Sequence, residues 1–124
     1  VADFRPATKS NTKIKEKQHL TIELEPNPDI AQELGKVKKE NQILAGFALE
    51  TNDEMQHAKG KLERKNFDFI VLNSLADEGA GFGYDTNKVT DIKRNGDITN
   101  FALKSKKEVA SDIISIFASM VNEK

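Results

Sequence analysis

The chain has 124 residues, of which 37% are hydrophobic and 31% charged, and its formal net charge is -1. This length and composition predict a single domain with a modest core. The near-neutral charge argues against a dedicated nucleic-acid-binding protein, which is usually basic. The lack of cysteine excludes disulfides, thiolate metal sites and a cysteine nucleophile within this chain. No apolar run is long enough to span a membrane.

The first fifteen residues are the most informative part of the sequence. Residues 1–3 predict the end of a buried strand that delivers the Asp3 carboxylate, and Arg5-Pro6 interrupts this strand. A polar loop then leads to Lys13, where a short strand or a mobile flap begins. An acid at a strand end followed by a basic loop is typical of an α/β nucleotide site, because lysine reaches phosphate oxygens. Since the chain starts inside this element, we expect it to be part of a longer protein.

A strand, a helix and another strand are predicted next. Apolar and polar residues alternate over residues 20–24, which predicts a half-buried strand. Asn27 as N-cap and Pro28 at the first helical position predict the start of a helix. The apolar stripe of this helix consists of Ile30, Leu34 and Val37. The continuous apolar run at residues 43–48 predicts a central strand that is buried on both faces.

A second helix follows, with Asn52 or Asp53 as its cap, and ends at about residue 65. Residues 67–72 predict a second buried strand. The glycine-rich stretch at residues 78–87 contains Gly79, Gly81 and Gly83, but no helix pattern follows it and the spacing does not match a dinucleotide fingerprint. We therefore interpret it as a flexible loop before a hairpin.

The last third of the chain predicts a hairpin and a helix. Asn95-Gly96 lies between two short strand patterns, at residues 88–93 and 98–103, which is a strong hairpin signal. Residues 106–122 predict a closing amphipathic helix. Its inward residues are Val109, Ile113, Ile116, Phe117 and Met120. The order of elements predicts an α/β fold: a Rossmann-like layered sheet with flanking helices and an antiparallel hairpin addition.

Two segments carry groups of a kind that can bind phosphate, and each also has an ordinary structural interpretation. Residues 28–31 form the first turn of a predicted helix, where free N–H groups and the helix dipole favour an anion, although an ordinary capped helix is the commoner meaning. Lys61 and Lys65 are four residues apart on the second helix and could clamp a polyphosphate, whereas a solvated basic face is the usual meaning of such a pair. His19 and His57 are predicted to be surface residues, and no metal-ligand spacing or nucleophile–His–acid arrangement is present.

Seven segments, in this order, resemble the C-terminal half of phosphopantothenate–cysteine ligase, also called phosphopantothenoylcysteine synthetase. They are Val1–Ala7, Lys13–Lys15, Leu20–Leu24, Asn27–Ile30, Gly46–Thr51, Lys61 with Arg64–Asn66, and Gly79–Asn87. In many bacteria this enzyme is the second half of a bifunctional protein with a flavin-dependent decarboxylase. The resemblance covers nearly the whole chain, so residues 1–124 are expected to be the C-terminal portion of the ligase domain, without its N-terminal half.

The resemblance implies an activity in coenzyme A biosynthesis. The carboxylate of 4′-phosphopantothenate attacks the α-phosphate of CTP, which gives an acyl-cytidylate and pyrophosphate, and the amine of cysteine then displaces CMP. Mg²⁺ accompanies the triphosphate, and FMN belongs only to the separate decarboxylase half. The family also implies a cytoplasmic homodimer, with no nucleic-acid partner and no membrane. The chemistry needs positioning and charge neutralisation more than a protein nucleophile.

The resemblance also assigns residues to the nucleotide site. Lys13 is the residue expected to act on the activated intermediate. The residues implied to bind the nucleotide are Asp3, Lys13, Pro28, Asp29, Ile30, Ala31, Phe47, Lys61 and Lys65.

Some positions depart from the family pattern. Leu49 replaces a small residue, and Asn73-Ser74 replaces the commoner Ala-Asn-Asp at that strand end. The half of the family that holds a glycine-rich turn and an asparagine linked to the acyl-nucleotide is absent, so we expect no complete active site in this chain alone. A non-catalytic nucleotide-binding or dimerisation module, and an ATP-using relative, are the alternative hypotheses.

Overall fold

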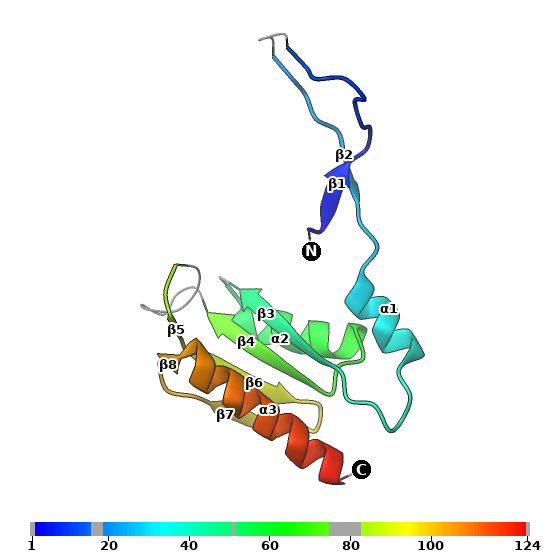
Figure 1. Cartoon of the computed structure of the whole chain (residues 1–124). Coiled ribbons are helices and arrows are strands. Elements are labelled where there is room, and N and C mark those ends of the chain that lie inside the picture. Colours follow the sequence, from blue (N-terminus) through cyan, green and yellow to red (C-terminus); the bar gives the residue numbers. More distant parts are fainter. Residues whose placement is uncertain (1, 16–18, 51, 75–82, 124) are drawn as a thin grey trace. The chain divides into compact units, whose positions relative to one another are not determined.

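The computed structural model describes residues 2–15, 19–50, 52–74 and 83–123. The chain divides into two compact units, residues 1–30 and residues 31–124. A two-stranded ribbon forms the first unit, and a mixed sheet with its helices forms the second (Figure 1).

The ribbon of the first unit pairs β1 (Phe4–Pro6) with β2 (Leu24–Pro26) in antiparallel register. An ion pair of 2.7 Å between the Arg5 guanidinium and the Glu25 carboxylate joins the two strands across the register pair. The prediction that Arg5-Pro6 interrupts a strand is therefore wrong. Pro6 is tolerated because a two-stranded ribbon leaves each strand with an unpaired edge.

Two further predictions for this unit are wrong. Ala2 and Asp3 are exposed and lie outside any strand, so no buried strand ends at Asp3. Leu20 and Ile22 are exposed and precede β2, and the described residues around Lys13 form no strand. The alternating pattern fails because the ribbon has no second layer within its unit against which an apolar face could pack.

Helix α1 (Ile30–Val37) starts two residues later than predicted. Asn27 does not cap it. Its side-chain amide instead donates to the Ala2 carbonyl at 2.7 Å and its oxygen accepts from Arg5 at 3.1 Å. The predicted apolar stripe is exposed, including Leu34 and Val37, whereas Ala31 packs on the core and Gly35 is buried. Hydrophobic spacing therefore selected the wrong face of this helix.

The sheet of the second unit has the strand order β3-β4-β6-β7. The strands are β3 (Ala45–Glu50), β4 (Phe69–Ser74), β6 (Val89–Lys93) and β7 (Ile98–Asn100). β3 and β4 are parallel, and the other pairs are antiparallel. Both predicted buried strands exist but lie two residues further along the chain. β3 is an edge strand among the described residues, and its Phe47 is 71% exposed, so the prediction of a central strand is wrong.

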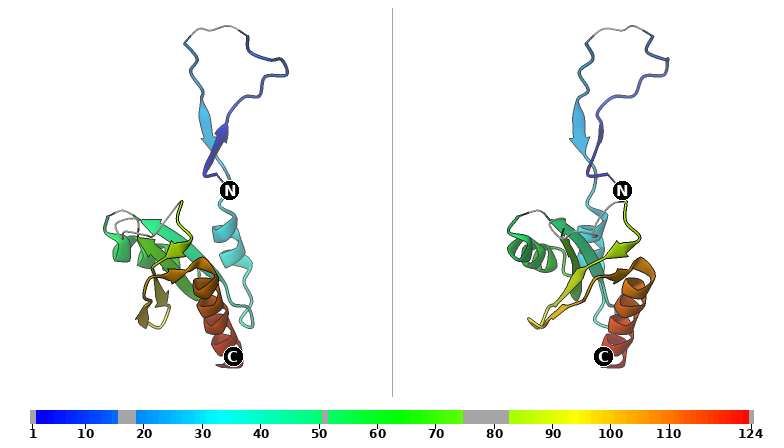
Figure 2. Two further views of the ribbon diagram at one scale, coloured as in Figure 1. Left: turned by 60° about the vertical axis from the view of Figure 1, so that its left-hand side comes forward. Right: turned by 90° about the vertical axis from the view of Figure 1, so that its left-hand side faces the viewer.

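Helices cover both faces of this sheet (Figure 2). On one face, α2 (Glu54–Arg64) buries Ala58 and Leu62 against alternate residues of β3, β4 and β6. On the other face, α3 (Lys106–Glu123) packs on Phe69, and the ring of Phe117 meets the Phe69 ring edge-on at 4.9 Å. All five predicted inward residues of α3 belong to this second cluster. The predicted α/β class with flanking helices is confirmed: the sheet is mixed, and helices lie on both of its faces.

Local chemistry explains several element ends. At Gly96, φ is +98°, as the predicted hairpin turn requires. A two-residue pair, β5 (Thr86–Asn87) with β8 (Lys104–Ser105), precedes α3. Ser105 and Glu108 then form a capping box: the Ser105 hydroxyl accepts from the Glu108 N–H at 3.2 Å, and the Glu108 carboxylate accepts from the Ser105 N–H at 3.0 Å. The Ser105 hydroxyl also donates to the Glu108 carboxylate at 2.6 Å, and this bond, followed by that from the Ser105 N–H, lowers the pKa of Glu108.

The predicted cap of α2 is correct in position only. Asp53 occupies the N-cap but has a left-handed backbone with φ of 46° and makes no side-chain cap hydrogen bond. The entry into β4 is fixed differently, because Asp68 is nearly buried and its Oδ2 accepts from Lys38 Nζ at 2.8 Å and from the Leu44 N–H at 2.7 Å. Lys38 thus has a structural role, since it ties the end of α1 to the start of β4.

Candidate functional site

The carboxyl end of β3 holds a group of charged side chains. Glu50 is the last residue of β3, and its Oε1 lies 2.6 Å from the Nζ of Lys61 on α2. The Glu50 side chain is only 13% exposed, whereas the Lys61 side chain is 33% exposed. The contact places the Lys61 ammonium at the carboxyl end of a parallel strand, which is where ligands bind in open α/β sheets.

His57 shares the same carboxylate. Its Nδ1 lies 3.5 Å from the second oxygen of Glu50, and its ring is half exposed. His57 and Lys61 are four residues apart on α2, so they face the end of β3 from one side of the helix. The predicted surface position of His57 is confirmed, but its pairing was not foreseen. Sequence reasoning also missed Glu50, although it lies inside the Gly46–Thr51 segment.

Lys65 is placed differently from Lys61. α2 ends at Arg64, and Lys65 is its C-cap residue, with φ of -97°. The Lys65 N–H donates to the Lys61 carbonyl at 3.0 Å, so the last hydrogen bond of the helix links the two lysines at the predicted spacing. The Lys65 carbonyl faces α1, where a Cβ on Gly35 would lie 2.0 Å from it.

Phe47 lies on the opposite face of β3 from the Lys61 group, whereas Ala31 lies on the same face. Successive residues of a strand point to opposite faces. Ala48 and Glu50 face α2, so Phe47 projects from the other face of β3, where its ring is exposed. Ala31 is half-buried against the core on the α2 face. The structure does not bring Phe47 and Lys61 to one face of the sheet.

The ribbon of the first unit brings together two of its predicted site segments. The Asp3 carbonyl accepts a hydrogen bond of 2.8 Å from the N–H of Asn27, the residue before Pro28. The side chains of Asp3, Pro28, Asp29 and Ile30 are exposed. Lys13 is also exposed and lies in the connection between β1 and β2.

The glycine-rich stretch falls largely outside the described residues, including Gly79 and Gly81. Its described end has Gly83 with φ of +85°, and the Asp85 carbonyl accepts from the Lys106 N–H at 2.9 Å. At the end of β4, Asn73 Oδ1 is buried with no hydrogen-bond partner among the described residues.

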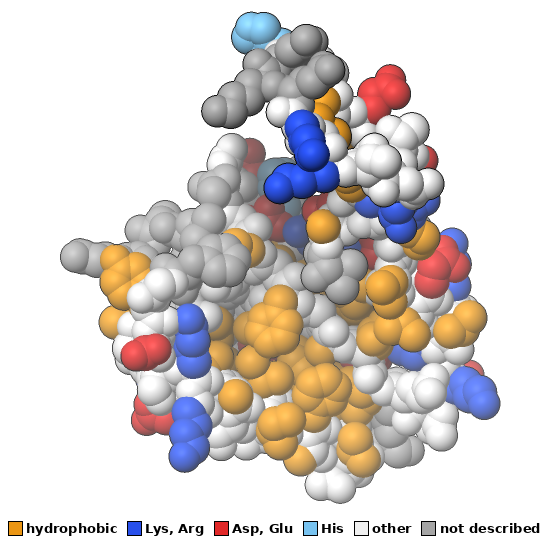
Figure 3. Space-filling model, turned by 45° about the horizontal axis from the view of Figure 1, so that its top comes forward, with side chains coloured by type: hydrophobic (Ala, Val, Ile, Leu, Met, Phe, Trp, Pro, Cys, Tyr) orange, Lys and Arg blue, Asp and Glu red, His pale blue; other side chains and the backbone are white. Residues whose placement is uncertain are grey.

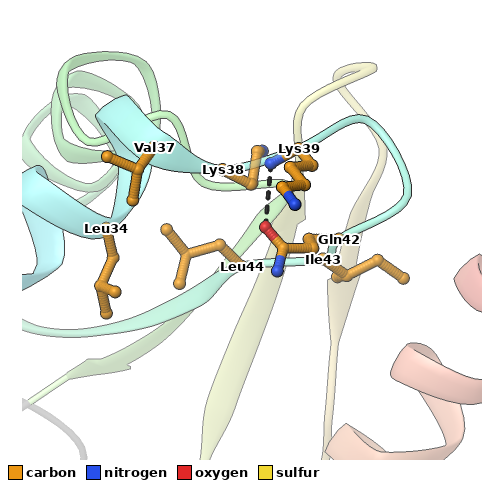
Figure 4. A pocket seen from close by; sticks show the side chains of 7 residues that line it. All are labelled: Leu34, Val37, Lys38, Lys39, Gln42, Ile43 and Leu44. Carbon is orange, nitrogen blue, oxygen red and sulfur yellow. Dashed lines mark hydrogen bonds between the residues drawn. The ribbon is translucent and has the colours of Figure 1, made fainter.

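A hollow of about 410 Å³ lies at the opposite end of β3 (Figure 4). Leu34 and Val37 of α1 line it together with Leu44, which precedes β3. Lys39 donates its backbone N–H to the Gln42 side-chain oxygen at 2.9 Å, which closes the connecting turn. The hollow adjoins the amino end of β3 and does not include the Glu50 group, so we do not assign it to the nucleotide.

Within the described ranges, no helix has both the length and the apolar composition needed to cross a membrane. Among the same residues, no three histidine, aspartate or glutamate side chains come together as a group that could hold a metal ion.

Comparison with known proteins defines the class and then the family. The mixed α/β unit resembles the solved C-terminal domain of Coenzyme A biosynthesis bifunctional protein CoaBC, with a TM-score of 0.75 and 35% identity, over 100% of this chain and 52% of that one. Residues 1–120 match the family profile of the DNA/pantothenate metabolism flavoprotein C-terminal domain. The chain belongs to this family, which confirms its resemblance to the phosphopantothenoylcysteine synthetase part of CoaBC proteins.

Two relatives show how the domain is used in longer proteins. The CoaBC protein of Bacillus subtilis (strain 168) is 44% identical over 97% of this chain and 30% of its own length. A protein from an unknown prokaryotic organism, named Cysteine/Cysteine sulfinic acid decarboxylase, is 55% identical over 98% of this chain and 34% of its own length. The chain therefore spans about a third of each relative.

Proposed function

We propose that this chain is the nucleotide-binding part of a phosphopantothenate–cysteine ligase that uses CTP in coenzyme A biosynthesis. A carboxylate oxygen of 4′-phosphopantothenate attacks the α-phosphorus of CTP, and pyrophosphate leaves. The amine of cysteine then attacks the acyl carbon of the acyl-cytidylate, and CMP leaves as the amide forms. The observation that carries the proposal is the match to a solved CoaBC C-terminal domain over the whole chain at 35% identity.

The residue roles follow from the charges of the proposed site. Lys61 would neutralise the triphosphate at the carboxyl end of β3, and Lys65 would add a second cation. Charge neutralisation of this kind is the main catalytic requirement when the leaving group is pyrophosphate. Lys61 is partly exposed and therefore accessible to an incoming phosphate.

Residues of the ribbon and of β3 would hold the rest of the nucleotide. Asp3 would accept hydrogen bonds from it, and Pro28, Asp29, Ile30 and Ala31 would line its site together with Phe47. Lys13 would contact the activated intermediate. The exposed positions of Asp3 and Lys13 leave both side chains accessible to ligands.

Mg²⁺ is proposed as part of the substrate complex. The described residues offer no ligand cluster for a resident metal. Mg²⁺ commonly reaches such sites bound to substrate phosphates and water, with few protein ligands. FMN is assigned to a decarboxylase domain outside this chain. A homodimer and a cytoplasmic location remain predictions from the family resemblance.

The test uses the parent protein that contains this chain. The protein is incubated with 4′-phosphopantothenate, cysteine, Mg²⁺ and either CTP or ATP, while pyrophosphate release is measured. We expect release that depends on CTP and on 4′-phosphopantothenate, and that falls strongly in Lys61→Ala. Lys36→Ala is the matched control, because Lys36 also pairs with a glutamate at 2.6 Å but is a surface residue of α1. Equal or faster release with ATP would support the ATP-using alternative.

A non-catalytic nucleotide-binding module is the second candidate. The relative with 55% identity is named as a decarboxylase, so proteins with this domain carry different activity names. In that case the parent protein would bind nucleotide in titration calorimetry but release no pyrophosphate under any substrate combination. That result would contradict the ligase proposal.

A further inference from the structure

The ion pair between Glu50 and Lys61 joins two consecutive elements, β3 and α2. Glu50 ends β3, and Lys61 lies in the last turns of α2. Glu50 Oε1 is buried, and the Lys61 ammonium lies 2.6 Å from it. The contact therefore depends on charge, and a neutral side chain of the same shape would not reproduce it.

Comparison with another lysine–glutamate pair shows what is unusual here. Lys36 and Glu33 on α1 also approach to 2.6 Å, but their side chains are 59% and 63% exposed. Such exposed pairs contribute little because water screens them and both chains stay mobile. Glu50 is 13% exposed, so its charge is screened less and its side chain has fewer alternative positions. The buried carboxylate can therefore fix where the lysine ammonium lies.

We propose that Glu50 is a positioning residue that holds the Lys61 ammonium at the carboxyl end of β3 for the nucleotide phosphates, an inference that rests on the proposed function. A lysine has three donors, and one buried anion leaves donors for a phosphate. A free lysine side chain would lose rotamer freedom on binding, and the ion pair removes part of that freedom beforehand. His57, on the other oxygen of Glu50, keeps the carboxylate between two α2 side chains.

The experiment is a double-mutant cycle on CTP binding by the parent protein. Titration calorimetry at low ionic strength measures Kd for wild type, Glu50→Gln, Lys61→Ala and the double variant. We expect Glu50→Gln to raise Kd by roughly two- to 150-fold, the range of coupling between contacting residues. In the Lys61→Ala background the same substitution should have no further effect. Glu33→Gln is the control and should leave Kd unchanged.

Each outcome has a definite meaning. Unchanged or tighter CTP binding by Glu50→Gln would overturn the inference, because the Glu50 carboxylate would then have no effect on phosphate binding or would repel the phosphates. Additive effects of the two substitutions would also overturn it, since Glu50 would act without Lys61. If the wild-type protein binds no CTP, the proposed function itself is refuted, and this result is distinct from the two variant outcomes above. Melting curves establish folding, and Glu50→Met is the second variant if the amide of Glu50→Gln disturbs the fold.

Discussion

Replacing the buried Asp91 by valine is expected to stabilise the chain. Asp91 lies in the middle of β6 and is 1% exposed. Neither carboxylate oxygen has a hydrogen-bond partner among the described residues. In the sheet register it pairs with Val71 of β4 and Thr99 of β7, and Val71 belongs to the apolar cluster beneath α3. A valine would match this surrounding.

The expected change in the free energy of unfolding has two parts: the removal of a buried carboxylate and the burial of methyl groups in its place. A buried polar group without a partner costs about 1–3 kcal/mol. Each buried methyl adds about 0.8 kcal/mol. We therefore expect Asp91→Val to raise the free energy of unfolding by at least about 2 kcal/mol at pH 7. Asp91→Asn removes the charge but retains an unpartnered polar group, so its gain should be smaller.

The effect must depend on pH. Burial raises the pKa of Asp91 above its ordinary value, and the opposing effect of the Lys93 charge is smaller. The folded state thus binds a proton more tightly than the unfolded state does. The contribution of Asp91 to the free energy of unfolding is most favourable below its unfolded pKa and is lost as pH rises through its folded pKa. The stability difference between Asp91→Asn and wild type should therefore be small at pH 4 and grow toward pH 7.

Urea denaturation, followed by circular dichroism from pH 4 to pH 7, measures this difference. All other carboxyl groups, including Glu108 with its lowered pKa, are common to the variants and cancel. A valine variant no more stable than wild type at pH 7 would refute the reasoning. So would an Asp91→Asn difference that stays constant across this pH range.

Three predictions concern the proposed activity. In the parent protein, Lys61→Ala or Lys65→Ala should weaken CTP binding by about 1.5–3 kcal/mol through loss of a charge-assisted contact. If the double variant binds CTP with unchanged affinity in calorimetry, the two lysines do not bind the triphosphate. Lys13→Gln should lower kcat/KM without changing the melting temperature, and normal turnover would exclude Lys13 from the mechanism. The 124-residue chain alone should unfold cooperatively but release no pyrophosphate from CTP, 4′-phosphopantothenate and cysteine; robust turnover would show that it holds a complete site.

The sequence predicted an element correctly where residues within that element determine its conformation. Asn95-Gly96 forms the expected turn because the positive φ of Gly96 suits glycine in any context. α3 packs the expected stripe against the core because one long helix lies along one sheet face. The ends of β3 and β4 were displaced by two residues, since an apolar run indicates burial but strand ends depend on pairing with a neighbour.

Exposure of apolar residues could not be predicted in the same way. Phe47 and Val37 are both 71% exposed, although each lies in an apolar pattern. Figure 3 shows apolar side chains gathered on the face in view. The periodic spacing of apolar residues predicts which face of a helix or strand they share. Whether that face is buried depends on the neighbouring element that packs against it.

The candidate site could likewise be predicted only in part from the sequence. The sequence identified Lys61 as a cation on α2, but not its counter-ion. Glu50 was missed because a glutamate after an apolar strand is common and becomes notable only when the fold buries it. The signal that could have found it was the combination of that strand-end glutamate with His57 and Lys61 at helical spacing on the next element.

Two helical glycines give the sharpest contrast between sequence and structure. Helix propensity predicts that alanine at either Gly35 or Gly60 stabilises the chain by about 1 kcal/mol. At Gly60 the new Cβ would meet only the end of the Arg64 side chain, at 2.8 Å, which can move away. At Gly35 it would lie 2.0 Å from the Lys65 backbone oxygen, so α1 would have to move. We expect Gly60→Ala to raise the melting temperature and Gly35→Ala to destabilise the chain by about 1–3 kcal/mol, as overpacked sites do. A stabilising Gly35→Ala would show that α1 does not pack closely against the end of α2.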